Sequence, residues 1–502
     1  MGKKDRLKRS AANVDTPDTA GAGTISSRFQ FFLWICSFFC FAALVLRTDV
    51  MTVWPGAEAY ALDHALSNDR GATMLSFLYA QLFPLGTAVD ATTEAIWLFP
   101  RLLSAAAMLV TAFFTYRLAG RLFGKAAVTL GLVAAAASLF LPFFGKVATP
   151  DALALCGQAG FLWCAYLTGA DRERSYLPPA AGFLFLAGLA APLSSLIFGA
   201  GAIVAARYLT GGSKAWVNLL LLLSIPLMIL LLQGGQGGRS YWFWGAHPLG
   251  YGRFLGYAFL GMAPLIGFLL AGLRDLFYKF PRGEQQARLY VAGLALSLLA
   301  QSLVFPLLLA LLAGKQMQLY FQAGNYPWKD WVRGGATVHL ILAFLAAFLA
   351  LAGTELSFDT SGAGFRAALG MAAAYWIFSL FAVVGLYGDK RDFALGGTVL
   401  SGVLGVLFFW VQVYPYLEVE RSWPSDLARE IPAGLPTYVA PGAEDLSVAL
   451  PYFRRAGIPV VHDSTTADLH LVSHPLSDSL RQVDAEVAGR VVLSRRVFGV
   501  RR

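Results

Sequence analysis

Charged residues are scarce in this sequence. Of its 502 residues, 14% are Asp, Glu, Lys or Arg and 57% are hydrophobic, whereas soluble domains carry about 25% charged residues. A soluble fold of this length could not hide so much apolar surface, because it still needs a large polar exterior. The net charge of +9 is spread over short loops between apolar blocks. This pattern argues against nucleic-acid binding and indicates loop charges that orient a membrane protein.

The sequence also has few cysteines and lacks the motifs of metal and nucleotide sites. Both His470 and His474 lack a third ligand at the spacing that a zinc site requires. Residues 414–502 contain no Gly-x-Gly-x-x-Gly turn that would mark a nucleotide site. The cysteines all lie in apolar stretches, where they behave as small hydrophobic residues: Cys36, Cys40, Cys156 and Cys164. The sequence therefore predicts no disulfide framework and no metal site, and it leaves any cofactor undefined.

Long apolar stretches dominate what is present. About twenty apolar residues are needed to cross about 30 Å of hydrocarbon as a helix. The stretches that approach this length number about twelve: 29–46, 95–118, 127–144, 152–167, 177–191, 193–208, 215–233, 254–273, 289–313, 336–352, 365–386 and 393–413. Residues 72–85 are apolar but short and end near Pro84, which favours an interfacial helix. We predict an all-α polytopic membrane protein with about 12–13 transmembrane helices.

Charge and composition divide the chain into three parts. Residues 1–28 are basic and polar, typical of a disordered cytoplasmic tail, and the apolar stretch that follows is too long for a cleaved signal peptide. Residues 29–413 form the membrane domain. Residues 414–502 alternate short β-rich and helical runs, which predicts a small soluble α/β domain.

Counting spans from a cytoplasmic N-terminus places four segments outside the membrane: 47–94, 145–151, 234–253 and 314–334. The basic loops follow the positive-inside rule as far as residue 313, whereas the cations of segment 314–334 lie outside against this bias. Beyond residue 313 the charges leave two topologies open. Twelve spans put the C-terminal domain in the cytoplasm, whereas one more crossing within residues 315–333 puts it outside.

Carboxylates in two of these external segments are candidates for chemistry. Glu58 and Asp63 lie in segment 47–94 and could act as a general base or orient an acceptor, although a solvated loop has the same composition. Asp151 stands at the start of a predicted span, after Pro150. It is suited to cap that helix and, at a membrane surface, to meet a substrate as well.

The other two segments offer aromatic and basic groups. Segment 234–253 is rich in Trp and Tyr around His247, which favours an aromatic belt or, alternatively, a surface that stacks lipids or sugars. Segment 314–334 carries Lys315 and Tyr320 among other cations and aromatics. Cations on the outer face could bind a phosphate or pyrophosphate through charge-assisted hydrogen bonds.

Residues 99–155 resemble the core signature of the GT-C superfamily of membrane glycosyltransferases. The similarity rests on an Arg-Leu-x-Ser opening at 101–104, a Gly-Arg-Leu-Phe-Gly turn at 120–124 and an Ala-Thr-Pro-Asp ending at 148–151. The pattern is most similar to the branch that contains the lipid A aminoarabinose transferase and the protein O-mannosyltransferases. A weaker similarity extends over most of the chain, since the Trp/His-rich segment and the C-terminal domain follow in the order expected for this family.

This resemblance implies an enzyme that moves a sugar from a polyprenyl-phosphate donor to a lipid, glycan or protein acceptor on the outer face of the membrane. It further implies a bacterial inner membrane protein with a cytoplasmic N-terminus, an external C-terminal domain and a link to lipopolysaccharide. The catalytic candidates are Glu58, Asp151 and Asp63. The substrate-binding candidates are Tyr60, Arg70, Arg101, Lys146, His247, Lys315 and Tyr320.

The sequence departs from this family in the first external segment. The family places a catalytic Asp about four residues before a Tyr, but counting back from Tyr60 reaches Gly56 and Ala57. The nearest carboxylate is Glu58, which we take as the best candidate base, with Asp63 as the substitute. A protein that binds a lipid-linked sugar without transferring it, or an assembly partner, remains the alternative. A transporter is less favoured, because ionisable residues cluster at span ends and no internal repeat is visible.

Overall fold

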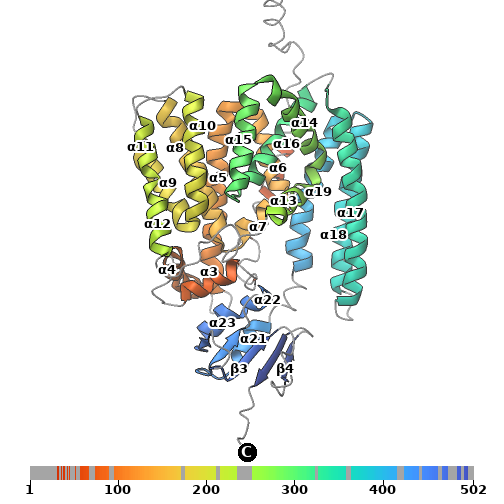
Figure 1. Ribbon diagram of the computed structural model, residues 1–502. Helices are drawn as coiled ribbons and strands as arrows, with labels where there is room; N and C mark the ends of the chain where they lie inside the picture. Colours follow the sequence, from red (N-terminus) through yellow and green to blue (C-terminus); the bar gives the residue numbers. More distant parts are fainter. Residues whose placement is uncertain are drawn as a thin grey trace, which may run out of the picture.

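The computed structural model describes residues 31–32, 35–36, 38–39, 42, 45, 51, 57–66, 74–89, 95–170, 176–210, 215–234, 251–322, 326–357, 363–414, 423–439, 444–461, 466–472, 483–487 and 491–495. They form a large helical bundle with a small α/β domain attached at one end (Figure 1). The expected fold class, a polytopic α-helical membrane protein, is confirmed. The predicted tail, residues 1–28, lies outside the described residues.

The bundle consists of short and long helices in chain order. These are α3 (Ala57–Leu66), α4 (Met74–Val89), η1 (Ala95–Trp97), α5 (Leu98–Phe123), α6 (Lys125–Ala137), α7 (Leu141–Lys146), α8 (Pro150–Ala170), α9 (Leu177–Ala190), α10 (Pro192–Thr210), α11 (Ala215–Leu222), α12 (Ser224–Gly234), α13 (Tyr251–Gly261), η2 (Ala263–Leu265), α14 (Ile266–Lys279), η3 (Phe280–Arg282), α15 (Gln285–Leu299), α16 (Val304–Gln322), α17 (Lys329–Ser357), α18 (Ala363–Tyr387), α19 (Arg391–Phe408) and the π-helical turn η4 (Phe409–Val413).

Six helices in the described part of the chain are long and apolar enough to cross a membrane: α5, α8, α10, α16, α18 and α19 with η4. A seventh span results if α13 and α14, which meet at an angle of 65°, are taken together. This number is below the twelve stretches predicted, because several stretches form shorter helices. The stretch 127–144, for example, divides into α6, which ends at Ala137, and the six-residue α7.

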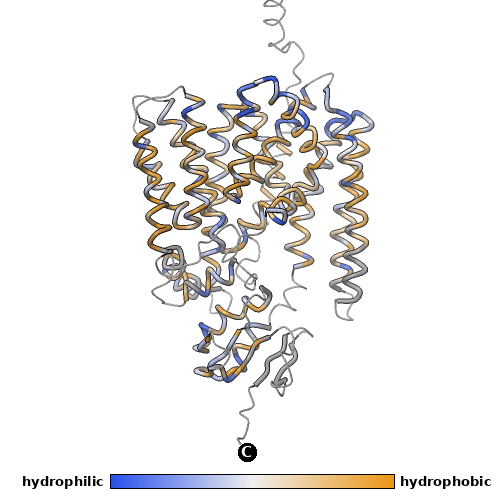
Figure 2. The backbone as a smooth tube through the Cα atoms, in the orientation of Figure 1, coloured by the Kyte–Doolittle hydropathy of each residue, from blue (hydrophilic) through white to orange (hydrophobic). Residues whose placement is uncertain are grey.

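The two ends of the bundle differ in polarity. Hydrophobic residues run along the helices, and hydrophilic residues gather at the end drawn uppermost (Figure 2). We call this the upper end; it includes the α5–α6 turn at Gly124, η3 and the α18–α19 turn at Asp389. The opposite, lower end carries α3, α4 and the C-terminal domain (Figure 1). Lys390 and Arg391 therefore lie at the end away from the C-terminal domain.

The path of the chain after residue 285 differs from the expectation. The predicted span 289–313 is two helices, α15 and α16, separated by a turn at residues 300–303. The expected external segment 314–334 is the end of α16 and the beginning of α17, and it lies at the upper end. The additional crossing that charge left undecided is thus made by α16, and it brings the chain to the lower end after α19. Most of the expected external segment 234–253 lies outside the described residues.

Glycine sets the spacing of the central helices α6 and α16. A Cβ atom built on Gly314 of α16 would lie 2.2 Å from the backbone nitrogen of Gly131 in α6. A Cβ on Gly131 would in turn lie 2.7 Å from the side chain of Leu311. Small residues allow such close backbone approach between membrane helices. The two glycines are therefore required where these helices cross.

The C-terminal domain contains a five-stranded sheet in the order β2-β1-β3-β5-β4. Strand β1 is parallel to β2 and β3, whereas β5 is antiparallel to β3 and β4. Its elements are α21 (Trp423–Glu430), β1 (Thr437–Val439), α22 (Glu444–Ser447), α23 (Ala449–Arg455), β2 (Val460–Val461), β3 (Leu469–Val472), β4 (Val483–Val487) and β5 (Val491–Arg495). Its core is continuous with that of the bundle, because Phe453 and Leu471 belong to one hydrophobic cluster with Tyr79 and Trp97. The domain is thus packed onto α3, α4 and the start of α5.

Candidate active site at the lower end of the bundle

A buried ion pair joins α3 to α5. Arg101 stands in the first turn of α5, and its Nε and Nη2 donate to the two carboxylate oxygens of Glu58 at 2.9 and 3.1 Å. Its Nη1 donates to the carbonyl oxygen of Met51 at 2.5 Å. Both charged side chains are fully buried. A bidentate arginine–carboxylate pair is among the stronger hydrogen-bonded arrangements, and removing one partner from a buried pair is costly. This pair therefore fixes the short helix α3 against the bundle.

The same carboxylate holds the connection between α7 and α8. The backbone N–H of Ala148 donates to Oε1 of Glu58 at 2.7 Å. This contact brings together Lys146, the last residue of α7, and Asp151, the second residue of α8. Both are buried, and the Lys146 Nζ lies 4.8 Å from the centre of the Trp410 ring. The Glu58–Arg101 ion pair thus lies beside the α7–α8 connection, which also carries the buried side chains of Lys146 and Asp151.

Several polar atoms around Asp151 are buried without a hydrogen-bond partner in the described part of the chain. They are Oδ2 of Asp151, Oγ1 of Thr149 and the hydroxyl of Tyr79. Thr149 lies close to Asp151, and Ser104 close to Tyr79, but neither pair has hydrogen-bond geometry. Buried polar atoms are normally satisfied. This group is therefore better suited to receive a ligand than to hold the fold together.

Tyr79 contributes a neutral hydroxyl to this group. Burial raises the pKa of its phenol well above the ordinary value, and the negative charges of Glu58 and Asp151 raise it further. The phenol therefore keeps its proton at neutral pH and can donate a hydrogen bond. Helix α4 positions it from the lower end of the bundle.

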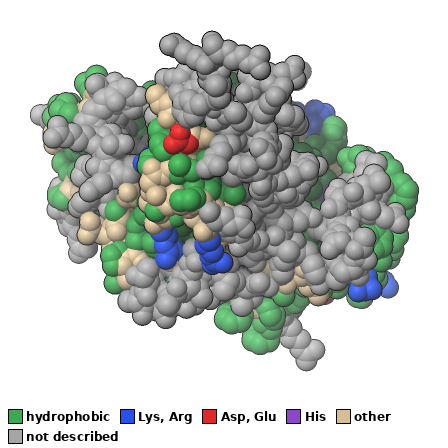
Figure 3. Space-filling view, turned by 90° about the horizontal axis from the view of Figure 1, so that it is seen from below, with side chains coloured by type: hydrophobic (Ala, Val, Ile, Leu, Met, Phe, Trp, Pro, Cys, Tyr) green, Lys and Arg blue, Asp and Glu red, His purple; other side chains and the backbone are tan. Residues whose placement is uncertain are grey.

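The C-terminal domain covers this region from below. Arg454 of α23 forms an ion pair with Asp63 of α3. The Tyr452 ring packs edge-on against Trp97, with 6.0 Å between the ring centres. Seen from below, few of the described side chains on the surface are acidic or basic (Figure 3). Glu58, Arg101, Lys146 and Asp151 are buried, so the charges of the candidate site are interior.

The structure brings only part of the predicted site together. Glu58 and Arg101 form a buried ion pair, and Glu58 contacts the α7–α8 connection that carries Lys146 and Asp151. Asp63 lies on the same helix as Glu58 but pairs with Arg454 of the C-terminal domain. Tyr60 is half-buried on α3. Arg70 and His247 fall outside the described residues.

Lys315 and Tyr320 lie elsewhere, on α16 near the upper end. The Lys315 Nζ is 5.6 Å from the ring centre of Phe123, the last residue of α5. Phe123 is ~33 Å along α5 from Arg101, at the rise of an α-helix. Tyr320 is buried against Phe268 and Tyr326. The structure therefore does not place these two residues with the ionic cluster, because the segment expected to be an external loop continues a helix to the other end.

Other residues of the site could not be identified from the sequence. Tyr79 lies in a segment that composition marked only as an interfacial helix. Trp410 and Tyr452 come from distant parts of the chain, and no local pattern distinguishes them from ordinary core or belt aromatics. Among the described residues, no group of three His, Cys, Asp or Glu side chains could hold a metal ion.

The fold matches that of a known membrane enzyme. The crystal structure of ArnT from Cupriavidus metallidurans bound to undecaprenyl phosphate superposes with a TM-score of 0.58 and 14% sequence identity, over 93% of this chain and 98% of that one. The apo form of the same protein gives a TM-score of 0.58 over 94% and 99% of the two chains, also at 14% identity. The GT-C-like fold that residues 99–155 predicted is thereby confirmed.

A weaker match is an oligosaccharyltransferase from Archaeoglobus fulgidus, with a TM-score of 0.36, 12% identity and coverage of 87% and 64% of the two chains. That score is too low to carry an argument about fold. Neither a protein-family model nor a curated protein matches this sequence.

Proposed function

We propose that this protein is a membrane glycosyltransferase that moves a sugar from a polyprenyl-phosphate donor to a lipid, glycan or protein acceptor. The observation that carries the proposal is the group of buried charged residues Glu58, Arg101, Lys146 and Asp151, set around the contact of α3 with α5 and the α7–α8 connection, on a fold shared with ArnT, which has been crystallised with undecaprenyl phosphate. The reaction site is the lower end of the bundle. A glycosyl transfer there requires a group that accepts the acceptor's proton and a cation that stabilises the departing phosphate.

Asp151 is the proposed general base. Glu58 was the first choice from the sequence, but its carboxylate already accepts three hydrogen bonds, from Arg101 twice and from Ala148. Proton transfer to Glu58 would disrupt these bonds, so it acts instead as a positioning residue for the α7–α8 connection. Asp151 has a buried oxygen, Oδ2, without a partner in the described structure. It can therefore receive a proton at lower cost.

The proposed step is balanced as follows. The acceptor hydroxyl gives its proton to the Asp151 carboxylate as its oxygen bonds to the anomeric carbon of the sugar. The bond from that carbon to the donor phosphate oxygen breaks, and the electron pair leaves with the polyprenyl phosphate. Lys146 stabilises the negative charge that develops on the phosphate, because a preorganised cation in a site without water acts strongly on such charge. Arg101 holds Glu58 and thereby α3 in place.

The proposed orientation puts the upper end in the cytoplasm and the lower end outside, in a bacterial inner membrane. Basic residues concentrate at the upper end, as the positive-inside rule requires for a cytoplasmic face: Arg117, Arg121, Lys125, Arg207, Arg282 and Lys390. Single cysteines at exposed Arg455 and Gln286 test this orientation with a membrane-impermeant thiol reagent in intact cells. We expect labelling at position 455 only, and labelling at 286 instead would reverse the orientation. The native cysteines described are buried and give a low background.

The test of the function is a turnover assay on the purified protein, with polyprenyl-phosphate sugars as donors and mass analysis of the acceptor. Asp151→Asn is expected to lower kcat roughly 10²- to 10⁴-fold, the usual contribution of a general base, with unchanged thermal unfolding. Asp330→Asn is the matched control, because Asp330 is also the second residue of a helix, α17, but is exposed at the other end. Equal turnover in both variants would mean that Asp151 is not the base and only stabilises the positive, N-terminal end of α8.

A protein that binds the lipid-linked sugar without transferring it is the second candidate. It is favoured by Ala57, which stands near the position of the family's catalytic Asp, and by the complete burial of Glu58 and Arg101. Binding of polyprenyl phosphate by a wild-type protein that turns over no donor would establish this alternative. Turnover by the wild type would exclude it.

A further inference from the structure

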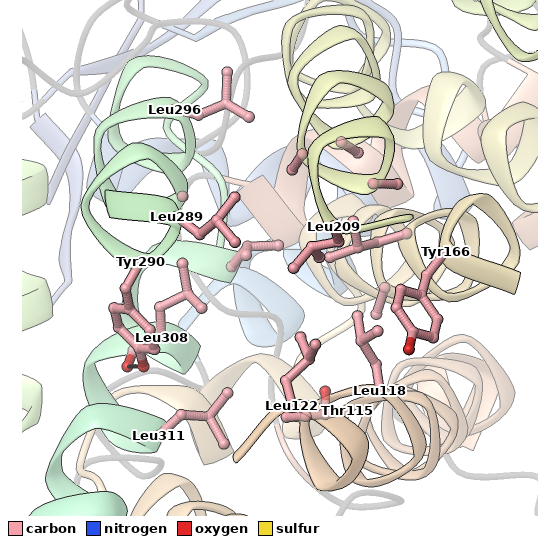
Figure 4. Close-up of a pocket in the computed structure, with 18 of the residues that line it drawn as sticks. Thr115, Leu118, Leu122, Tyr166, Leu209, Leu289, Tyr290, Leu296, Leu308 and Leu311 are labelled. Atoms are coloured by element: carbon pink, nitrogen blue, oxygen red, sulfur yellow. Dashed lines mark hydrogen bonds between the residues drawn. The ribbon is translucent and has the colours of Figure 1, made fainter. Parts of the chain in front are cut away.

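A cavity lies in the upper half of the bundle, away from the charged residues of the candidate active site. It has a volume of about 390 Å³ and lies between five helices: α5, α8, α10, α15 and α16. Leucine side chains from opposite walls point into the same space, among them Leu118, Leu209, Leu289 and Leu308 (Figure 4). The hydroxyl of Tyr290 is turned aside and donates to the carbonyl oxygen of Leu308. Thr115 and Tyr166 add two hydroxyl groups to the lining, and most of the remaining interior is hydrocarbon.

The length of the cavity matches one leaflet of a membrane. Helix α10 lines it from Phe198 to Leu209, and α15 lines it from Gln285 to Leu296. Each stretch rises ~17 Å along its helix, which is close to half of the ~30 Å hydrocarbon core of a bilayer. A lipid chain of the leaflet at the upper end would fill this depth.

The upper end of the cavity is polar and mainly basic. The exposed Gln285 and Gln286 line its rim. Exposed arginines stand on the same turns as lining residues: Arg121 next to Leu122, Arg207 next to Ala206, and Arg288 next to Leu289. Glu284 is the carboxylate at this rim among the described residues. The balance of charge therefore favours an anionic group.

One of these arginines is linked to the wall of the cavity. The Arg121 guanidinium lies 4.9 Å from the ring centre of Trp163. That ring stacks on Tyr166, which lines the cavity, with 6.2 Å between ring centres. A cation held over an aromatic face keeps its N–H groups available at the rim.

We propose that this cavity binds one acyl chain of an anionic phospholipid from the leaflet at the upper end, with the phosphate among Arg121, Arg207 and Arg288. This site is distinct from the donor site. A polyprenyl phosphate whose head group lies at the ionic cluster is ~33 Å away along α5 and cannot place that head group at this rim. The inference depends on the cavity and its charges, and it holds whether or not the protein is a transferase.

Photo-crosslinking of the full-length protein in nanodiscs tests the proposal. The probe is phosphatidylglycerol with a diazirine on its acyl chain, in a phosphatidylcholine background, and labelled positions are mapped by peptide mass spectrometry. We expect labels on the cavity walls of α10 and α15. Ala205→Phe, which fills the cavity, should lower this labelling several-fold; Leu289→Trp is a second filling variant if the first does not fold. Val204→Phe is the matched control, because Val204 is the preceding residue of α10 and is 67% exposed.

The head group is tested separately. The double variant Arg207→Gln/Arg288→Gln should lower the labelling several-fold, whereas Arg366→Gln, an exposed arginine at the beginning of α18 and the lower end, should not. Equal labelling by a phosphatidylcholine probe with the same chain would overturn the anionic specificity. Stronger wall labelling by a photoactivatable polyprenyl phosphate would replace the phospholipid with the donor lipid. Labelling confined to lipid-facing positions such as 204 would show that the cavity stays empty.

Discussion

The two ends of the bundle each contain a cluster of charged and polar side chains, but the clusters are built differently. At the upper end Asp275 accepts hydrogen bonds from Lys279 at 3.0 Å, Gln316 at 3.2 Å and Trp328 at 3.3 Å. Tyr326 in turn donates to Gln316 at 2.7 Å. These contacts connect α14, α16 and the start of α17. They saturate the carboxylate, which is typical of a group that holds helices together.

The lower end combines a saturated carboxylate with an unsaturated one. Glu58 has three hydrogen bonds, whereas Oδ2 of Asp151 and the Tyr79 hydroxyl are buried and lack a partner within the described structure. A buried polar atom without a partner lowers stability unless a ligand or water satisfies it. The upper end also has one such atom among the described residues, the hydroxyl of Tyr320. The two ends therefore differ chiefly in their carboxylates: Asp275 accepts three hydrogen bonds, whereas Asp151 keeps one open oxygen, on which its proposed role as a base rests.

The largest effect on stability is expected from breaking the Glu58–Arg101 pair. Arg101→Met leaves the Glu58 carboxylate buried without its main partner, which should lower the free energy of unfolding by about 3–5 kcal/mol. The double variant Glu58→Gln/Arg101→Met should recover much of this loss, since it removes the unpaired charge and keeps an acceptor for Ala148. Thermal unfolding in detergent measures both. A double variant no more stable than Arg101→Met would mean that the pair does not act as a unit.

A smaller effect is expected at the upper end. Asp275→Asn keeps one acceptor oxygen but loses the charge that Lys279 and Trp328 contact, so we expect a loss of about 1–3 kcal/mol in the free energy of unfolding. Donor turnover per folded molecule should not change, because the residue lies at the end opposite Asp151. A drop in kcat at unchanged stability would place chemistry at the upper end and reverse the comparison.

The smallest effect concerns the exposed pairs of Asp389. The hydrogen bond from Lys329, helped by the charges of Lys329 and Arg333, holds the pKa of Asp389 below its usual value. Its stabilising contribution is therefore present above the ordinary aspartate pKa and is lost as the pH falls through the lowered value. Because the side chain is exposed, wild type and Asp389→Asn should differ little in thermal unfolding at pH 7 and not at all in strong acid. A large difference would show that this turn supports the bundle.

The sequence predicted the membrane class and the GT-C-like fold, whereas the roles of the site residues stay predictions. Motif spacing drew attention to Arg101 and Asp151, which lie in one continuous segment, residues 99–155, whose helices pack on each other. Sequence spacing could not show that the Glu58 carboxylate accepts three hydrogen bonds, because the donors Arg101 and Ala148 lie 43 and 90 positions away. The number of hydrogen bonds that a carboxylate accepts depends on tertiary packing, which the local sequence pattern does not reveal.

The misplaced segment has a specific cause. Hydropathy treated residues 289–313 as one span, because the turn at 300–303 contains no glycine or proline. Gln301 makes this turn with φ of 47°, a backbone conformation that residues other than glycine rarely adopt. Pro306, in the first turn of α16, was the available signal, since proline is tolerated at that position and breaks a helix interior. A helix that starts near Pro306 places Lys315 at the upper end of the bundle.

The contact of Arg454 with Asp63 also sets an order of events during biosynthesis. The two residues are 391 positions apart. At 5–20 residues per second, α23 is made roughly 20 to 80 s after α3. During that interval α3 has no domain beneath it, and the contacts of Asp63 with Arg454 and of Trp97 with Tyr452 have not yet formed. A chaperone or the insertion machinery that covered α3 until the last segment arrived would protect this part of the nascent chain.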